Sequence, residues 1–535
     1  MLEYFAAIAV VLIYIGIFVA IRRYKVGGKW GLGTTGPLIM WKTSRGKVVI
    51  DRISRHERVW KVAGDVSIGV VLVLFTGMLI LLLWEATVVM TIPRERAPQP
   101  QTLLGIPGLN PVIPVGYGIL GLVIGIITHE FSHGIMARAQ GLKVQSLGLI
   151  FLIVPLGAFV EPDEDELKKT ERRKRMRVYA AGPASNILVS SVTLVLYLLL
   201  INSVHPVAEG CVVAGVGTDS PASRSGIQQY TLITSINGTK ITSAESIFNI
   251  SGIQPGTKVR LQGLYRGSHI EYECYAGVSL IEIVKGFPAE EGGLKPGMIL
   301  ISIEGHSNTT RIMNQNDLSR TLSWMMPGDR INVSVYEWEK NRSSYIMRSF
   351  AGITLTSKYE YYAKYAPGLN REEYKSVAFL GITSGYMGMI FVDTEDLIRP
   401  SAAPFSGAES VTDYFLSGLR FLSLPLLGLS PIDSPVSDLY APGGVLGSTP
   451  SPLFWIAVNS LYWIFWISIM LGLTNALTLF VTDGTPIFKD SLDYLCIRAN
   501  YNPEKREKLT SSLTAFFSFL VVFLILWQMI GPRIV

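Results

Sequence analysis

The sequence predicts a polytopic α-helical membrane protein of about six transmembrane helices, with an inserted extracytoplasmic β-rich region. Of its 535 residues, 49% are hydrophobic and only 16% are charged, which departs from the composition of soluble globular proteins. Several uncharged runs reach the length of about 20 residues that a helix needs to cross a bilayer. Between the fourth and fifth of these runs lie about 250 more polar residues, 202–452, with short alternating apolar patterns typical of strands.

Six apolar segments are candidate membrane helices: 4–21, 66–92, 113–137, 178–201, 453–482 and 511–531. The first segment lacks a basic start and a small-residue cleavage site, so we expect a retained helix and not a signal peptide. The fifth segment has no charge for thirty residues. As one straight helix it would be about 45 Å long against a hydrocarbon core of about 30 Å, so we expect it to tilt or to break at Gly472.

Basic residues predict the orientation of these segments. The stretch 22–65 carries eleven Lys and Arg against three acids, and 138–177 and 484–510 are also basic. These three stretches lie on one side if the N-terminus is outside and every segment crosses once. Because basic loops stay in the cytoplasm, we expect both termini and the region 202–452 to lie outside. Five N-x-S/T sequons in that region agree with this map: Asn237, Asn249, Asn308, Asn332 and Asn341.

The external region contains a repeat. The stretches 216–241 and 284–308 both contain Pro-Ala, then a glycine followed by an apolar residue, and then an alternating strand closed by Asn-Gly or Glu-Gly. The repeat period of about 67 residues suits two small domains, predicted at 207–278 and 279–356. The pattern resembles that of PDZ domains, which bind extended peptides at a sheet edge. Two β-rich modules that act only as spacers are the alternative.

The rest of the external region, 357–452, is an extension with a linker. We expect strands at 375–395 and a Pro-, Gly- and Ser-rich linker at 429–452. The segment 412–430 has an apolar face and either lies along the outer membrane surface or is a buried helix of the external domain. An oxidising exterior permits a disulfide between Cys211 and Cys274, whereas Cys496 falls in a cytoplasmic loop.

The segment 113–137 ends in ITHEFSHGIMA, which places two histidines and a glutamate inside an apolar helix. Titratable residues inside a membrane are expensive and are usually functional. His129 and His133 are four residues apart and share one helix face, with Glu130 beside the first. Two imidazoles in this arrangement can hold a divalent metal while the carboxylate acts on water, as in the H-E-x-x-H zinc peptidases. The alternative is a purely structural role, in which the two histidines form hydrogen bonds to neighbouring helices.

A catalytic zinc usually takes three protein ligands, so a third must come from elsewhere. The candidate is Asp483, which ends the uncharged segment 453–482. On the predicted topology this segment and 113–137 both run inward, so the two motifs reach the same depth. A helix cap or an interfacial charge is the alternative role for this aspartate.

The chain resembles the site-2 protease family of membrane-embedded zinc metalloproteases. His-Glu-Phe-Ser-His at 129–133 matches the first family motif, and Asn475 to Asp483-Gly484 matches the second. The family's Pro is Thr478 here and its usual Leu before the Asp is Thr482, although the Asn-to-Asp spacing is kept. Ala-Gly-Pro-Ala-Ser-Asn at 181–186 also resembles a family stretch. The resemblance covers 113–201 and 453–490 as the two halves of a catalytic core, and it extends to the PDZ-like modules, since such insertions are a family feature.

The resemblance implies one Zn²⁺ per chain held by His129, His133 and Asp483, with Glu130 as general base and Asn475 steadying the oxyanion. It also implies that 157–161 dips beside the site as a loop or hairpin. There the implied substrate-binding residues are Gly157, Ala158, Phe159 and Val160.

The partners that follow are single-span membrane substrates, peptide segments at the PDZ-like domains and the lipid bilayer, with no nucleic acid. The released fragment would be cytoplasmic, for example a transcription regulator. The first two helices, in 1–92, and residues 310–450 add little to the resemblance, and 509–531 is expected to be a C-terminal membrane helix. A metal-dependent receptor or scaffold with a degenerate core, and a transporter with an ion site at the His/Asp cluster, are the competing functions.

Overall fold

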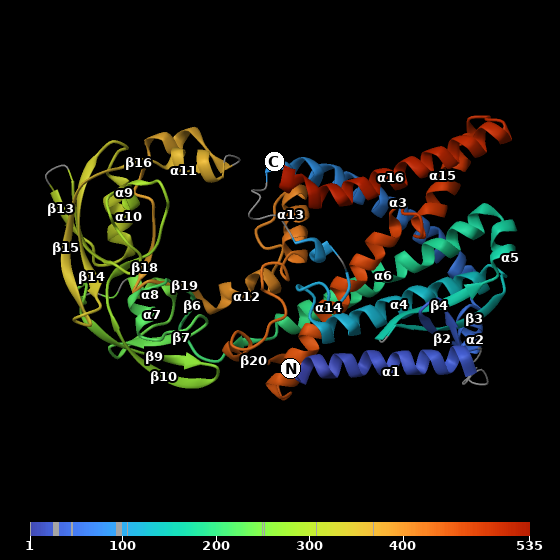
Figure 1. The fold of residues 1–535 in the computed structure, drawn as a ribbon, viewed down its shortest axis with the longest axis horizontal. Helices are drawn as coiled ribbons and strands as arrows, with labels where there is room; N and C mark the ends of the chain where they lie inside the picture. Colours follow the sequence, from blue (N-terminus) through green and yellow to red (C-terminus); the bar gives the residue numbers. More distant parts are fainter. Residues whose placement is uncertain are drawn as a thin grey trace. The chain divides into compact units, whose positions relative to one another are not determined.

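The computed structural model describes residues 2–24, 31–43, 46–91, 99–103, 105–152, 154–248, 250, 252–305, 308–366 and 369–534. The chain divides into two compact units. The helical unit comprises Met1–Leu200, Pro425–Pro431 and Ile456–Val535, and the β-rich unit comprises Ile201–Leu424 and Ile432–Trp455. Figure 1 shows the elements of each unit.

The helical unit is built from long apolar helices. Within the described residues, five helices are long and apolar enough to cross a membrane: α3 (Glu57–Val88), α4 (Val115–Ala139), α6 (Arg172–Ile201), α14 (Ser451–Ala476) and α16 (Pro503–Ile534). Helix α1 (Leu2–Tyr24) covers the predicted first segment, and its crossing of the membrane stays a prediction. Helix α3 has 32 residues and is about 48 Å long, so it extends beyond a hydrocarbon core of about 30 Å.

The predicted break at Gly472 is wrong. Helix α14 continues through Gly472 and ends at Ala476, and the chain then turns until α15 (Gly484–Arg498) begins. Gly472 instead serves close packing, because a Cβ there would lie 2.9 Å from Ile187 Cδ1 and 3.2 Å from the Pro183 carbonyl oxygen of α6. The overlong apolar segment is therefore shortened by ending the helix before Asp483.

A four-stranded antiparallel sheet, in the order β1-β2-β3-β4, belongs to the helical unit. Its strands come from two of the three predicted cytoplasmic loops, 22–65 and 138–177: β1 (Leu32–Thr35), β2 (Leu38–Thr43), β3 (Val144–Leu152) and β4 (Val154–Pro162). The short helices α2 (Lys47–Ile53) and α5 (Glu164–Lys169) flank it. Strand β4 forms one edge of the sheet and lies along α4, so the predicted hairpin at 157–161 is an edge strand.

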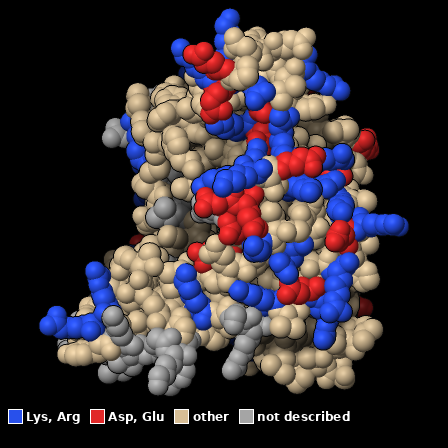
Figure 2. Space-filling model, turned by 90° about the vertical axis from the view of Figure 1, so that its right-hand side faces the viewer, with Lys and Arg blue, Asp and Glu red and all other residues tan. Residues whose placement is uncertain are grey.

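The basic residues at the start of α6 are paired with acids from neighbouring helices. The guanidinium groups of Arg173 and Arg177 both donate to Asp65 of α3, with N–O distances of 2.8–3.0 Å. Arg175 donates to both carboxylate oxygens of Asp490 in α15. Such two-pronged pairs fix orientation as well as charge. Figure 2 shows the face on which Lys, Arg, Asp and Glu gather, as expected for a membrane–water boundary.

The β-rich unit contains two sheets of the same design. The first has the order β10-β9-β7-β6-β19 with β8 beside β7, and the second has the order β15-β14-β12-β11-β18 with β13 beside β12. Strand β6 begins at Cys211 and β11 begins at Val278, 67 residues later, so the repeat in the sequence is a structural repeat.

The bounds of the repeated strands and helices are as follows. In the first repeat they are β6 (Cys211–Val216), α7 (Pro221–Arg224), β7 (Leu232–Ile236), β8 (Thr239–Lys240), α8 (Ala244–Phe248), β9 (Lys258–Tyr265) and β10 (Ser268–Tyr275). In the second they are β11 (Val278–Ile283), α9 (Pro288–Glu291), β12 (Ile299–Gly305), β13 (Asn308–Arg311), α10 (Gln315–Ser323), β14 (Arg330–Glu339) and β15 (Ser344–Thr354).

The predicted strands at 375–395 complete both sheets. Strand β18 (Ile382–Tyr386) pairs with β11, and β19 (Met389–Asp393) pairs with β6. The predicted domain ranges 207–278 and 279–356 omit these two strands, because sequence spacing does not reveal a strand that returns from further along the chain. The remaining elements of this unit are β5 (His205–Pro206), β16 (Thr356–Ser357), α11 (Lys358–Tyr365), β17 (Ala378–Phe379), α12 (Thr394–Ala402), α13 (Val411–Leu422) and β20 (Tyr440–Ala441).

Two further expectations change. The predicted linker 429–452 contains β20, which pairs with β5, so part of it is ordered in a small sheet.

The prediction of a disulfide between Cys211 and Cys274 is wrong, because both thiols are free and buried. Strands β7 and β9 lie between the strands that carry them. With strands about 4.8 Å apart, that separation exceeds the span of a disulfide. Burial raises the pKa of the Cys274 thiol to about 12, which makes it a poor nucleophile.

Candidate metal centre

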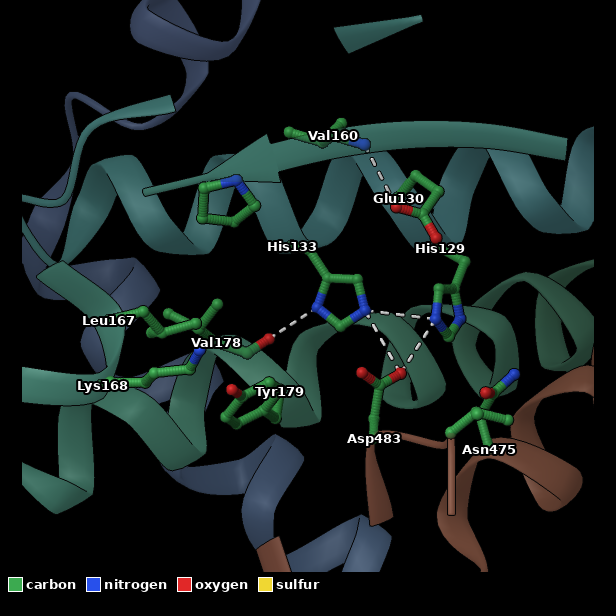
Figure 3. Close-up of a pocket in the computed structure, with 12 residues that line it drawn as sticks. His129, Glu130, His133, Val160, Leu167, Lys168, Val178, Tyr179, Asn475 and Asp483 are labelled. Carbon is green, nitrogen blue, oxygen red and sulfur yellow. Dashed lines mark hydrogen bonds and ion pairs between the residues drawn. The ribbon is translucent and has the colours of Figure 1, made fainter. Parts of the chain in front are cut away.

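The two histidines of α4 converge on one point. His129 and His133 lie one helical turn apart, and their Nε2 atoms are 3.1 Å from each other. The residues are 7% and 8% exposed, so neither imidazole is freely solvated. Figure 3 shows both rings pointing into the same cavity. The i, i+4 spacing of the sequence therefore produces the expected common face.

Asp483 joins the two histidines from a segment 350 residues away in sequence. Its Oδ2 atom lies 3.0 Å from His129 Nε2 and 3.3 Å from His133 Nε2. Asp483 occupies the cap position of α15, but its side chain makes no capping hydrogen bond. The turn before it is held by the Thr482 hydroxyl, which donates to the Leu477 carbonyl and accepts from the Leu479 N–H. The carboxylate is therefore aimed at the histidines and does not cap the helix.

Two glycines of α4 allow α14 to approach closely enough to deliver Asp483. A Cβ at Gly121 would lie 2.8 Å from the Trp463 carbonyl oxygen, and a Cβ at Gly125 would lie 2.7 Å from Leu471 Cδ1. Small residues four apart are the usual device for close helix packing in membranes, where no hydrophobic effect drives helices together. The sequence shows the Gly-x-x-x-Gly spacing, but it does not show which helix packs against these glycines.

Helix α6 closes the other side of the histidines with three residues at i, i+4 and i+8. The Val178 carbonyl oxygen lies 2.7 Å from His133 Nδ1. A Cβ at Gly182 would lie 2.4 Å from His133 Nε2 and 2.6 Å from His129 Nε2, so only glycine fits. Asn186 Nδ2 lies 3.1 Å from His129 Nδ1. Sequence reasoning did not assign roles to these residues, although the spacing of 178, 182 and 186 was available as a signal.

The chemistry of this group suits a divalent metal. A carbonyl oxygen only accepts, so the hydrogen of neutral His133 is on Nδ1 and its Nε2 presents a lone pair. The two Nε2 atoms and one carboxylate oxygen lie within 4.8 Å of one another. Ligands about 2.0–2.2 Å from a tetrahedral zinc are themselves about 3.3–3.6 Å apart. The observed separations of 3.0–3.3 Å are within a few tenths of an ångström of this range. The residues present therefore fit zinc with a fourth position left for water.

Glu130 and Asn475 line a cavity of about 370 Å³ around these three side chains. Glu130 Oε2 accepts a hydrogen bond of 3.2 Å from the Val160 N–H of β4. Asn475 Nδ2 donates to the Leu471 carbonyl of its own helix at 3.1 Å, so its amide nitrogen is engaged locally. Lys168 and Tyr179 also line the cavity and were not foreseen.

The predicted substrate-binding residues, Gly157, Ala158, Phe159 and Val160, lie in the edge strand β4. Their register pairs Gly157 with Ile150 and Val160 with Leu147 of β3. Backbone groups alternate in direction along a strand, and the Val160 N–H points away from β3 toward Glu130. The backbone groups of Ala158 and Val160 therefore face the edge beside the cavity, and those of Gly157 and Phe159 face β3.

Comparisons with known proteins agree with this arrangement. The model of peptidase family M50 matches residues 117–521, which is most of the chain and includes both halves of the candidate centre. An uncharacterized protein of Methanocaldococcus jannaschii is 30% identical over 241 residues, covering 44% of this chain and 62% of the relative. A protein of Neisseria meningitidis named as a putative zinc metalloprotease is 27% identical over 244 residues, covering 35% of this chain and 53% of the relative.

The chain thus spans between half and two thirds of the length of these two relatives. The family match rests on more than half of the chain and on the segments that carry His129, His133 and Asp483. Together with the apolar helices that surround them, these findings identify the chain as a member of peptidase family M50, a family of zinc metalloproteases.

Proposed function

We propose that the protein is an intramembrane zinc metalloprotease that cuts the membrane helix of single-span proteins and releases a cytoplasmic fragment, such as a transcription regulator. The observation that carries the proposal is the convergence of His129, His133 and Asp483, with Glu130, on one cavity at the end of an apolar helix. A carboxylate beside an open metal position is the arrangement used for metal-assisted peptide hydrolysis.

In this mechanism His129, His133 and Asp483 would hold one zinc ion, and the ion when bound would supply Lewis acidity toward water and the scissile carbonyl. Glu130 accepts the proton of the attacking water and passes it to the leaving amine. Asn475 lines the same cavity and would stabilise the developing oxyanion after leaving the Leu471 carbonyl.

The substrate must present an extended segment, because a helix hides its own peptide bonds. The edge of β4 offers the backbone groups of Val160, which lines the cavity, and of Ala158 two residues earlier, so an unwound substrate would add a strand there. The Val160 N–H is held by Glu130 before substrate enters. Substrate pairing would then release the Glu130 carboxylate for its role as a base.

The topology completes the proposal. The basic loops 22–65, 138–177 and 484–510 lie in the cytoplasm, and the termini with the β-rich unit lie outside. The tandem modules, PDZ-like in their sequence pattern, would bind peptide segments and restrict which substrates reach the core. The repeated strand and helix order supports two equivalent modules.

The test is cleavage of candidate single-span proteins in lipid, with and without a zinc chelator, next to zinc analysis of purified variants. Glu130→Gln should keep about one zinc per chain and cut on the order of a hundredfold more slowly. Asp483→Ala and His133→Ala should lose zinc and activity together. Asn475→Ala should keep the metal and lose rate.

A matched control is Glu85→Gln, which changes another carboxylate of a membrane helix, paired with Gln528 of α16 and absent from the cavity lining. It should cut at the parent rate. Cleavage at the parent rate by Glu130→Gln would refute the enzyme proposal. A chelator-sensitive ion flux without cleavage would favour the transporter alternative.

A further inference from the structure

Asn186 is buried beside the metal centre with half of its amide unused. The residue is 0% exposed, and its Oδ1 atom has no hydrogen-bond partner among the described residues. Its Nδ2 atom lies 3.1 Å from His129 Nδ1, so the amide is in direct contact with a proposed ligand. An unsatisfied buried acceptor is destabilising, which calls for an explanation.

The two imidazoles differ in how their Nδ1 atoms are held. His133 Nδ1 faces the Val178 carbonyl, which can only accept and therefore fixes the hydrogen on Nδ1 in every state. His129 Nδ1 faces an amide, which can either donate or accept after a half-turn. With Nδ2 donating, His129 carries its hydrogen on Nε2 and donates it to Asp483 Oδ2 at 3.0 Å.

Metal binding reverses the requirement at His129. An Nε2 atom that donates its lone pair to a metal leaves the hydrogen on Nδ1, which then needs an acceptor. A half-turn of the Asn186 amide brings Oδ1, the atom now without a partner, to that position. The same side chain thus satisfies His129 with and without metal, whereas the Val178 carbonyl fits only one arrangement.

We propose that Asn186 is a positioning residue of the metal centre, whose side-chain oxygen accepts the Nδ1 hydrogen of His129 when Nε2 binds zinc. The proposal rests on the proposed zinc site and adds a residue outside its ligand set. Partners of this kind typically change metal affinity 10- to 100-fold.

The test compares zinc dissociation constants of the full chain in detergent, measured by competition with a chromophoric chelator. Asn186→Leu removes the acceptor at similar volume and should weaken zinc binding about 10- to 100-fold. Asn186→Asp keeps an oxygen at the same place and should stay within about threefold of the parent. Ser190→Ala, a buried polar change one turn further along α6, should bind zinc like the parent.

The outcomes separate this inference from the proposed function. If the parent binds no zinc, the proposed function fails. If the parent binds zinc and Asn186→Leu binds it equally well, only the role of Asn186 fails. A loss in Asn186→Asp as large as in Asn186→Leu would also overturn the role, because it would show that the amide donates. Unfolding temperatures without metal show whether each variant is folded. If Asn186→Leu does not fold, the zinc dissociation constant of Asn186→Asp tests the role of Asn186 by itself.

Discussion

At the residue scale, the candidate centre depends on the α6 residues beside the histidines as much as on the proposed ligands. Val178, Gly182 and Asn186 form one stripe of α6 that faces His129 and His133, and each contributes differently. The carbonyl orients one imidazole, the amide contacts the other, and the missing Cβ of Gly182 leaves room for both rings. A ligand set in the sequence therefore becomes a site only through the backbone that lies beside it.

The first prediction at this scale is that Gly182→Ala loses zinc. The added Cβ would lie 2.4 Å from His133 Nε2, closer than any real contact, so the rings or the helix must move. We expect zinc affinity to fall by more than tenfold, on the order of the effect of losing an orienting partner. Chelator competition measures this. Gly116→Ala in α4 is the control, because a Cβ there meets nothing within 4 Å, and equal affinities of the two variants would contradict the packing argument.

At the element scale, the centre is assembled by helices that approach through glycines and by a helix that ends early. Helix α14 packs on α4 at Gly121 and Gly125 and on α6 at Gly472. It ends at Ala476, two residues before Thr478, which replaces the Pro of the family motif. The Thr482 hydroxyl then donates to the Leu477 carbonyl and holds the following turn. At the two positions where the sequence departs from the resembled motif, Thr478 is buried and Thr482 supplies the hydroxyl that holds the turn before Asp483.

The prediction at this scale concerns the contact between α4 and α14. Gly121→Ala places a Cβ 2.8 Å from the Trp463 carbonyl, a backbone atom that cannot move without shifting α14. We expect unfolding free energy to fall by about 1–3 kcal/mol, as for an overpacked core, and zinc affinity to fall with it. Unfolding in detergent checks the first effect and chelator competition the second. If Gly121→Ala is as stable as Gly116→Ala, α4 and α14 have room for an added Cβ at this point and the packing argument is wrong.

At the scale of the whole molecule, the two units have separate cores and the chain passes between them. The β-rich unit closes on itself, since Cys211 at the start of β6 pairs with Asp393 at the end of β19. The segment 211–393 therefore begins and ends at neighbouring points of one sheet. It contains none of the proposed zinc ligands, so we expect it to restrict substrates and not to take part in catalysis.

The prediction at this scale is that excision of 211–393, with Gly210 joined to Thr394 by a short flexible linker, leaves zinc bound and broadens the range of substrates cut. Zinc analysis and cleavage of several single-span proteins measure the two effects. Excision of 211–356 alone is the control, and it should aggregate because β18 and β19 lose their sheets. A shortened protein that binds zinc but cuts nothing would mean that the modules present substrate.

The sequence by itself determined the long apolar helices, the internal repeat and the pairing of His129, Glu130 and His133 on one face, because these depend on hydrophobic length and local periodicity. The position of Asp483 at the end of an uncharged segment, together with the resemblance of Asn475–Asp483 to a family motif, also indicated the proposed third ligand. Such features depend on residues that are close together in the chain, so they can be predicted from the sequence.

Only the tertiary structure decided which distant elements meet. It placed Asp483 Oδ2 at 3.0 Å from His129, set Val178, Gly182 and Asn186 against the imidazoles, and returned β18 and β19 to sheets that begin more than a hundred residues earlier. It also ended α14 beyond Gly472 and separated Cys211 from Cys274 by two strands. Each of these outcomes depends on close packing between segments far apart in the chain, and close packing is decided by shape in three dimensions, which no local pattern encodes.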